Sequence, residues 1–268
     1  MGFGFSVAAL LPTARVSGPL RMGLVRIAEE EWRDPAPDVA ARSAVFRAHP
    51  DAVRVLPGSE AAIAELGELL GIDGDLTAIA SACHEDWNLL TQAEPGGPFV
   101  LVAGAVGYPT DWQIGEKIGK PVHAVHEPTH GFAERLANPV DHFMDQLRPQ
   151  DLFGRTNMFV LASSDYRYMP TVPMAQRFAH VTPENAGETL YVRCERETLR
   201  RLPRSGAIVF GIGIYRAPLG SLSDENLARV AKSLTGFMPG EDERRGVPHY
   251  GPALAGYLDR RLGVEVAA

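Results

Sequence analysis

The stretch Ala-Ile-Val-Phe-Gly-Ile-Gly-Ile-Tyr, residues Ala207–Tyr215, is the clearest strand signal in the chain. Its β-branched and aromatic side chains favour a pleated, buried strand. A similar run, Phe-Val-Leu-Val-Ala-Gly-Ala-Val-Gly-Tyr, spans Phe99–Tyr108 and follows a turn at Pro95–Pro98. Its small residues allow a neighbour to pack closely. We therefore predict two buried strands, around which the rest of the fold is arranged.

Shorter segments on either side predict further strands alternating with short helices. Strands are predicted at Met158–Ala162 and from Leu190 to about Glu195. Asn138-Pro139 is a typical helix start, so residues 140–147 are predicted to be helical. We also predict helical segments at residues 110–118 and, before Pro203, at residues 198–202. These segments predict an antiparallel sheet that carries short helices.

The two ends of the chain have helical patterns. Residues 22–76 are predicted to be helical, most clearly between Ser59, a good N-cap, and Gly71, a typical stop. Ser223 is predicted to cap a later helix, and a last helix is predicted at residues 252–262. We expect an α+β fold in one domain, residues 1–268, with a sheet core at about 80–220 and helical extensions at 20–76 and 221–264.

Composition excludes several classes of protein. The 268 residues carry a net charge of −7 and no dense Lys/Arg run, so we expect no nucleic acid partner and no attraction to anionic membranes. No apolar run reaches the ~20 residues that span a bilayer, and we expect a cytoplasmic protein. Cys83 and Cys194 are too few for a four-thiolate iron–sulfur cluster. Any electrons would therefore come from another protein.

Three histidines gather between Val122 and Phe132: His123, His126 and His130. The neighbouring prolines, Pro121 and Pro128, favour an extended or kinked loop over a regular helix. Such a loop suits one axial histidine for a larger cofactor, and a His-rich zinc or iron site is the competing interpretation. His126 is the best candidate for a fixed ligand, while His123 and His130 stay open as alternatives.

Three charged stretches are candidates for the chemistry. The segment Cys83–Trp87 is interpreted as a solvated turn, and Arg155 as a candidate clamp for a carboxylate or propionate. In Tyr191–Leu202, Arg193 and Glu195 are predicted to share the strand face opposite Val192. A carboxylate beside a guanidinium is a plausible anchor or proton acceptor for a substrate amine. The competing interpretation is a ladder of ion pairs on an exposed face.

A set of short motifs, taken in order, resembles the haem-dependent oxidative N-demethylase family of the dimethylamine-demethylating α-subunit type. The matching stretches are Glu85-Asp86, Tyr108-Pro109 through Trp112, Glu116 to Gly119 with Pro121, Val125-His126 with Pro128, Arg155 to Asn157, Arg193 to Pro203, and Val209 to Tyr215 with Pro218-Leu219. Each motif is weak alone, but their order and spacing are specific. The likeness covers about residues 20–235.

This resemblance implies a PAS-like antiparallel sheet that binds haem b. It implies that His126 is the axial iron ligand, and that Arg155, Lys117 and Arg196 are candidates for contacts with the haem propionates. Glu195 is the candidate catalytic carboxylate that holds the substrate amine, and Arg193 beside it is the second catalytic candidate. The expected activity is that of a haem-dependent monooxygenase oxidising an amine or amino-acid-like substrate by N-demethylation, hydroxylation or N-oxidation. It would use O2 and electrons from a separate flavin and iron–sulfur reductase.

The chain also departs from the family pattern, most clearly at Gly213, where relatives have an arginine. This change is expected to open space beside the sheet and to favour a bulkier amine than dimethylamine. Two other functions stay open, namely a non-catalytic haem-binding PAS-type sensor or carrier, and a non-haem metalloenzyme with histidine ligands. The identity of the substrate and the oligomeric state stay open, and a homo-oligomer is one of the alternatives.

Overall fold

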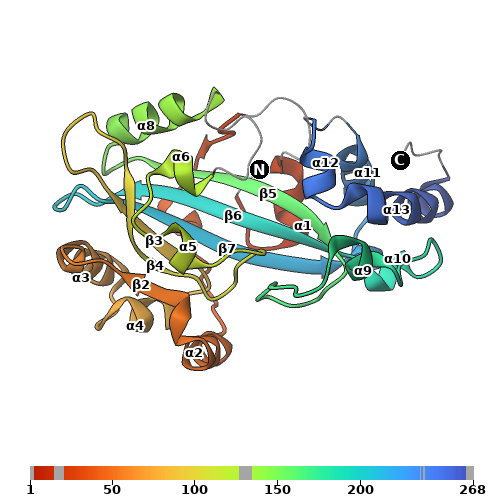
Figure 1. The fold of residues 1–268 in the computed structure, drawn as a ribbon, viewed down its shortest axis with the longest axis horizontal. Helices are drawn as coiled ribbons and strands as arrows, with labels where there is room; N and C mark the ends of the chain where they lie inside the picture. Colours follow the sequence, from red (N-terminus) through yellow and green to blue (C-terminus); the bar gives the residue numbers. More distant parts are fainter. Residues whose placement is uncertain (1–2, 15–20, 127–134, 236, 238, 264–268) are drawn as a thin grey trace.

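An antiparallel sheet forms the centre of the computed structural model, which describes residues 3–14, 21–126, 135–235, 237 and 239–263 (Figure 1). In this part of the chain the sheet has seven strands in the order β1-β5-β6-β7-β3-β4-β2. They are β1 (Val25–Arg26), β2 (Val53–Val55), β3 (Asp86–Thr91), β4 (Val100–Ala105), β5 (Leu152–Leu161), β6 (Tyr191–Arg201) and β7 (Ile208–Pro218). With helices on both sides, the sheet confirms the predicted α+β class.

The sheet has two faces because side chains alternate along each strand. One, here the α5 face, carries Phe153, Leu199 and Phe210, which pack with α5 (Ile114–Lys117), α6 (Val122–Val125) and α8 (Ala137–Gln146). Figure 1 shows α5 and α6 in front of the strands. The opposite side, here the α13 face, carries Met158 and Cys194, which pack with helices from both ends of the chain.

The helices that contribute to the cores of the α13 face come from the N-terminal third and from the segment after β5. They are α1 (Val7–Leu10), α2 (Val39–Ala48), α3 (Glu60–Leu70), α4 (Leu76–Ser81), α9 (Met174–Phe178), α10 (Ala186–Thr189), α11 (Asp224–Ala231) and α13 (Val247–Leu262). The remaining short elements are α12 (Glu241–Arg244), η1 (Leu11–Thr13), η2 (Glu29–Glu31), η3 (Pro50–Ala52), η4 (Leu219–Ser221) and η5 (Lys232–Leu234). None of the helices described is long and apolar enough to cross a membrane.

All four predicted strands are present, as β4, β5, β6 and β7. The helical segment predicted at residues 198–202 is wrong, because β6 continues to Arg201 and pairs there with β7 at Ile208. The solvated turn predicted at Cys83–Trp87 is also wrong. Asp86 begins β3, and the Glu85 and Asp86 side chains are buried.

Most predicted helices are present, with shifted ends. Between Ser59 and Gly71 lies α3, and Gly71 has a φ of 69°, which glycine tolerates at a helix end. The last helix begins at Val247, earlier than predicted. The segment 22–76 is not helical throughout, since it contains β1 and β2. The segment predicted at residues 110–118 shortens to α5.

The proline-flanked histidine segment is helical at its start, contrary to the predicted loop. Pro121 is the N-cap of α6, and His126 is its C-cap. A proline at this boundary costs no intrahelical hydrogen bond, because the first amides of a helix have no partner within it. Residues 127–134, which include Pro128 and His130, lie outside the described residues.

Candidate functional site

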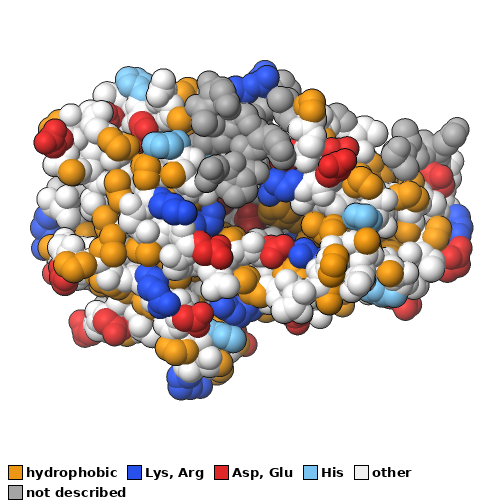
Figure 2. Space-filling model, viewed as in Figure 1, with side chains coloured by type: hydrophobic (Ala, Val, Ile, Leu, Met, Phe, Trp, Pro, Cys, Tyr) orange, Lys and Arg blue, Asp and Glu red, His pale blue; other side chains and the backbone are white. Residues whose placement is uncertain are grey.

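A hollow lies on the α5 face over the middle of β5 and β6 (Figure 2). Charged side chains of both signs surround it, and hydrophobic side chains lie within it. Many sheet residues on this face are only half-buried, among them Arg155, Asn157, Phe159, Glu195, Glu197, Phe210 and Ile212. The centre of this face is therefore accessible, while α5, α6 and α8 cover one end of it.

His126 is placed at this face by α6. Its Nδ1 lies 2.9 Å from the carbonyl oxygen of Val122. A carbonyl only accepts, so Nδ1 carries the proton and Nε2 carries the lone pair. Burial, with a smaller contribution from Lys117 and Arg155, lowers the pKa of His126 to about 4. The imidazole is therefore neutral at pH 7, the form that binds a metal.

The other two histidines of the segment differ from His126. His123 is exposed, whereas His126 is half-buried, and His130 lies outside the described residues. Within the described ranges, no three His, Cys, Asp or Glu side chains lie close enough together to hold a metal ion. Of the histidines described in this segment, His126 is the one that the fold fixes by a hydrogen bond.

Two of the three cations that the resemblance suggested for the propionates, Lys117 and Arg155, influence the pKa of His126. Lys117, on α5, donates from Nζ to the carbonyl oxygen of Val125 at 2.7 Å and lies over the Trp112 ring. Burial lowers the pKa of Lys117. On β5, Arg155 pairs through Nε with Glu197 Oε2 at 3.1 Å. Both cations are close enough to lower the pKa of the imidazole, and both already have polar partners.

Two carboxylates follow each other on this face of β6. Glu195 accepts a hydrogen bond from the Thr110 hydroxyl at 2.6 Å and another from Asn157 Nδ2 at 3.1 Å. Glu197 was not among the predicted site residues. Burial raises its pKa to about 7, with Glu195 adding to the rise and Arg155 opposing it. The period of two along a strand was the available signal, because it places residue 197 on the same face as Glu195.

Arg193 shares this face with Glu195, as predicted, but it lies under the loop after β4. Its guanidinium donates to the Thr110 hydroxyl at 2.9 Å and to the backbone carbonyls of Tyr108, Pro109 and Asp165. The side chain is 1% exposed. Arg193 therefore supports Glu195 through Thr110 and does not face the hollow.

The prediction for Arg196 is wrong, because the structure places it on the α13 face, away from His126. Its side chain is fully buried between the Phe3 and Phe5 rings. The guanidinium donates to the carbonyls of Phe3, Gly4, Glu31 and Trp32. Arg196 thus fastens the N-terminal segment to the sheet and lies outside the candidate site.

The space expected at Gly213 is filled. A Cβ at this position would lie 3.2 Å from the Tyr215 ring and 3.6 Å from the His84 ring. Gly213 pairs with Arg196 in the sheet, so a side chain at position 213 would lie on the α13 face. This glycine therefore gives no reason to expect a bulkier substrate.

A family model matches the part of the chain that contains these residues. The model of a family described as haem-dependent oxidative N-demethylase, alpha subunit-like, matches residues 72–255. The match begins later than the predicted likeness and extends further toward the C-terminus. It includes all the residues described above around the hollow and covers more than half of the 268 residues. The chain therefore belongs to the haem-dependent oxidative N-demethylase, alpha subunit-like family.

Proposed function

We propose that this chain binds haem b through His126 and oxidises a small amine held on the α5 face. Membership of the family supports haem-dependent oxidative chemistry. The proposal rests mainly on one observation. A neutral imidazole, two cations and two carboxylates lie on the same accessible face of the sheet. In this proposal, the PAS-like sheet at about residues 80–220 and the two helical extensions form one haem-binding domain.

The residues present suit a haem. In many metal sites the histidine ligand donates its other ring N–H to a carbonyl, and the Nδ1 of His126 makes such a bond to Val122. The two propionates of a haem need cationic partners, and Lys117 and Arg155 are the cations beside His126. Val125 and Trp112 contribute apolar surface at the same end of the face. These residues would hold the haem, and Arg196 would make no contact with it.

When bound, haem supplies O2 binding and the oxidation of a C–H bond next to the substrate nitrogen. For an N-methyl amine, the balanced reaction consumes one O2, two electrons and two protons, and it yields the demethylated amine, formaldehyde and water. The N–CH3 bond is broken and an N–H bond replaces it. Cys83 and Cys194 are both buried, and we propose that a separate flavin and iron–sulfur reductase delivers the electrons.

The carboxylates bind and orient the amine. Glu195 is held by Thr110 and Asn157, so it presents a fixed charge to a substrate ammonium. Glu197 has a pKa near neutrality and can exchange a proton at the working pH, which makes it our choice for the acceptor of the ammonium proton. Removal of that proton frees the nitrogen lone pair before oxidation.

The Glu195→Gln variant tests the proposed anchor. It keeps the shape of the side chain but removes its charge, so we expect amine affinity to fall on the order of 10- to 100-fold, as for hydrogen bonds to charged groups. Calorimetric titration of the haem-loaded protein with dimethylammonium and larger N-methyl ammonium salts measures the change. Glu188→Gln, at an exposed position of α10, is the matched control. Equal affinities in the two variants would show that Glu195 is not the anchor.

Amine binding should also depend on pH. Since burial raises the pKa of Glu197 to about 7, its side chain is neutral below this pH and anionic above it. The substrate stays an ammonium ion throughout, so binding should strengthen on the order of tenfold between pH 6 and pH 8, following the ionised fraction of one group. Titrations across this range, repeated with Glu197→Gln, provide the check. A pH profile that is unchanged in the variant contradicts the assignment.

A further inference from the structure

We propose that Arg245, in the helical extension after the sheet, is a positioning residue for Glu195 and acts through Asn157. Arg245 is the C-cap of α12, and its side chain reaches β5. Its Nη2 donates to Asn157 Oδ1 at 3.3 Å, and Asn157 Nδ2 donates to Glu195 Oε2 at 3.1 Å. The C-terminal extension is thereby connected to the substrate carboxylate through one amide.

The connection matters because an amide side chain can be turned either way. Asn157 Oδ1 accepts from Arg245 and also from the backbone N–H of Met158 at 3.1 Å. An arginine has only donors, so it selects the oxygen end of the amide. The NH2 end must then point to Glu195, which is its direct cross-strand neighbour in the sheet. With the opposite orientation, two oxygens would face each other.

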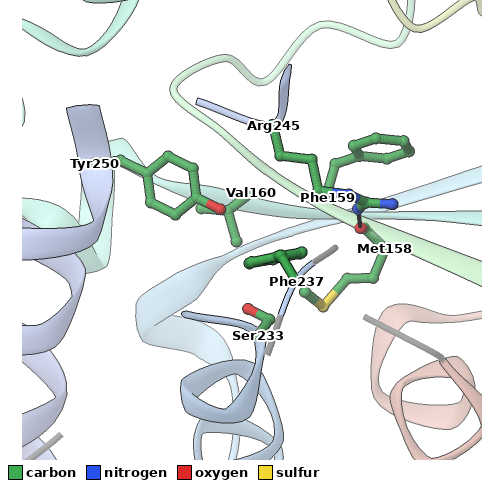
Figure 3. A pocket seen from close by; sticks show the side chains of 7 residues that line it. All are labelled: Met158, Phe159, Val160, Ser233, Phe237, Arg245 and Tyr250. Carbon is green, nitrogen blue, oxygen red and sulfur yellow. Dashed lines mark hydrogen bonds between the residues drawn. The ribbon is translucent and has the colours of Figure 1, made fainter. Parts of the chain in front are cut away.

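Arg245 is itself held from several sides. Its Nε donates to Glu241 Oε1 at 2.8 Å, and Nη1 donates to the Met158 carbonyl at 2.7 Å. Figure 3 shows the guanidinium at the Met158 carbonyl and beside Phe159, whose ring centre lies 4.7 Å from Cζ. Ser233 and Tyr250 line the same small pocket. A side chain fixed in this way keeps the Asn157 amide in one orientation.

On the other side of Glu195, Thr110 has the same role as Asn157, and Arg193 has the same role as Arg245. Arg193 donates to the Thr110 oxygen, so the Thr110 hydroxyl hydrogen is directed to Glu195 Oε1. Each oxygen of Glu195 thus receives a donor whose direction is imposed by an arginine behind it. Neither arginine needs to contact the substrate, and each fixes the direction of one hydrogen bond to Glu195.

The inference rests on the proposed function for its effect on the substrate, but the contact itself is testable without haem or amine. The Asn157 side-chain NH2 gives a pair of signals in a nitrogen–proton NMR spectrum, assigned by their loss in Asn157→Asp. In Arg245→Met these signals should shift and exchange faster with solvent, because the amide is no longer held. Arg244→Met is the matched control, since Arg244 also pairs with Glu241, whereas the hydrogen bond to Asn157 comes from Arg245. It should leave the Asn157 signals in place.

Amine titration then measures the consequence for binding. We expect affinity about 3- to 10-fold weaker in Arg245→Met than in Arg244→Met, the range for losing one supporting hydrogen bond in a network. Arg245→Lys should give an intermediate shift of the Asn157 signals, and it serves as the test if the methionine variant does not fold. Asn157 signals that are identical in the Arg245 and Arg244 variants would overturn the inference. Failure of the proposed function would instead appear as no amine binding by the parent protein, with the Asn157 signals still reporting on Arg245.

Discussion

His126→Ala is expected to remove haem from the protein, whereas His123→Ala leaves haem content unchanged. Even the loss of a partner behind a metal ligand costs ~10–100-fold in metal affinity, so loss of the axial ligand should cost at least as much. The two histidines lie in the same segment, but only His126 is half-buried and fixed by the Val122 carbonyl. The comparison therefore separates a ligand from a surface histidine. Absorbance in the Soret region after loading with haem, divided by protein concentration, gives the result.

The same assignment predicts how haem retention depends on pH. Burial lowers the pKa of His126 to about 4, so protons compete with iron for the imidazole only near or below that pH. Haem should stay bound on acidification to about pH 5, a range in which an exposed histidine is already protonated. Similar haem content in His126→Ala and His123→Ala would contradict the ligand assignment. In that case His130, or a non-haem site, becomes the better hypothesis.

The parts of the fold that the sequence predicted are those set by local patterns. Ser59 and Gly71 flank α3, and the left-handed stop at Gly71 depends on a few neighbouring residues. The Ser59 hydroxyl donates to the Leu56 carbonyl and does not cap the helix. The apolar run at residues 207–215 predicted β7 for a similar reason, since its side chains suit a buried strand whatever lies beside it.

The errors occurred where tertiary partners override local composition. Residues 198–201 include two arginines and a leucine, which suit a helix, but pairing with both β5 and β7 keeps them in a strand. β3 was not predicted because its first residue, Asp86, is charged and follows the charged Glu85. Asp86 is buried there by a salt bridge from Arg42, which is 44 positions away in the sequence. No local pattern contains that partner.

Local sequence patterns also predicted only part of the candidate site. The sequence predicted that Arg193 and Glu195 share a face, because strand periodicity requires it. The contacts that hold Glu195 come from Thr110, 85 positions away, and Asn157, 38 positions away. Arg196 was assigned to the site by its motif, yet the same periodicity places it on the opposite face. The face of each residue was predictable from β6, whereas its neighbours depended on the folding of distant segments.

Asp86→Ala is expected to be strongly destabilising, and its effect should extend to the loop that reaches Glu195. Asp86 accepts from Arg42 Nη2 at 2.8 Å and from the backbone N–H groups of Gly107 and Tyr108 at 2.7 and 3.0 Å. Both charged side chains are almost fully buried. Removing the carboxylate leaves a buried guanidinium without its counter-charge, which costs about 3–5 kcal/mol. Urea unfolding of the parent and the variant measures this loss.

Two further variants separate the loss of the ion pair from other causes. Glu68→Ala removes an ion pair with Arg204 in which both side chains are about two-thirds exposed, and it should cost less than about 1 kcal/mol. Arg42→Met in the Asp86→Ala background removes the uncompensated charge, so the double variant should be more stable than Asp86→Ala alone. If Asp86→Ala costs no more than Glu68→Ala, the buried pair does not stabilise the fold. If the double variant gains nothing, the cost comes from the two amides of Gly107 and Tyr108. Since these amides begin the loop that carries Thr110, that result would link the stability of the sheet directly to the position of Glu195.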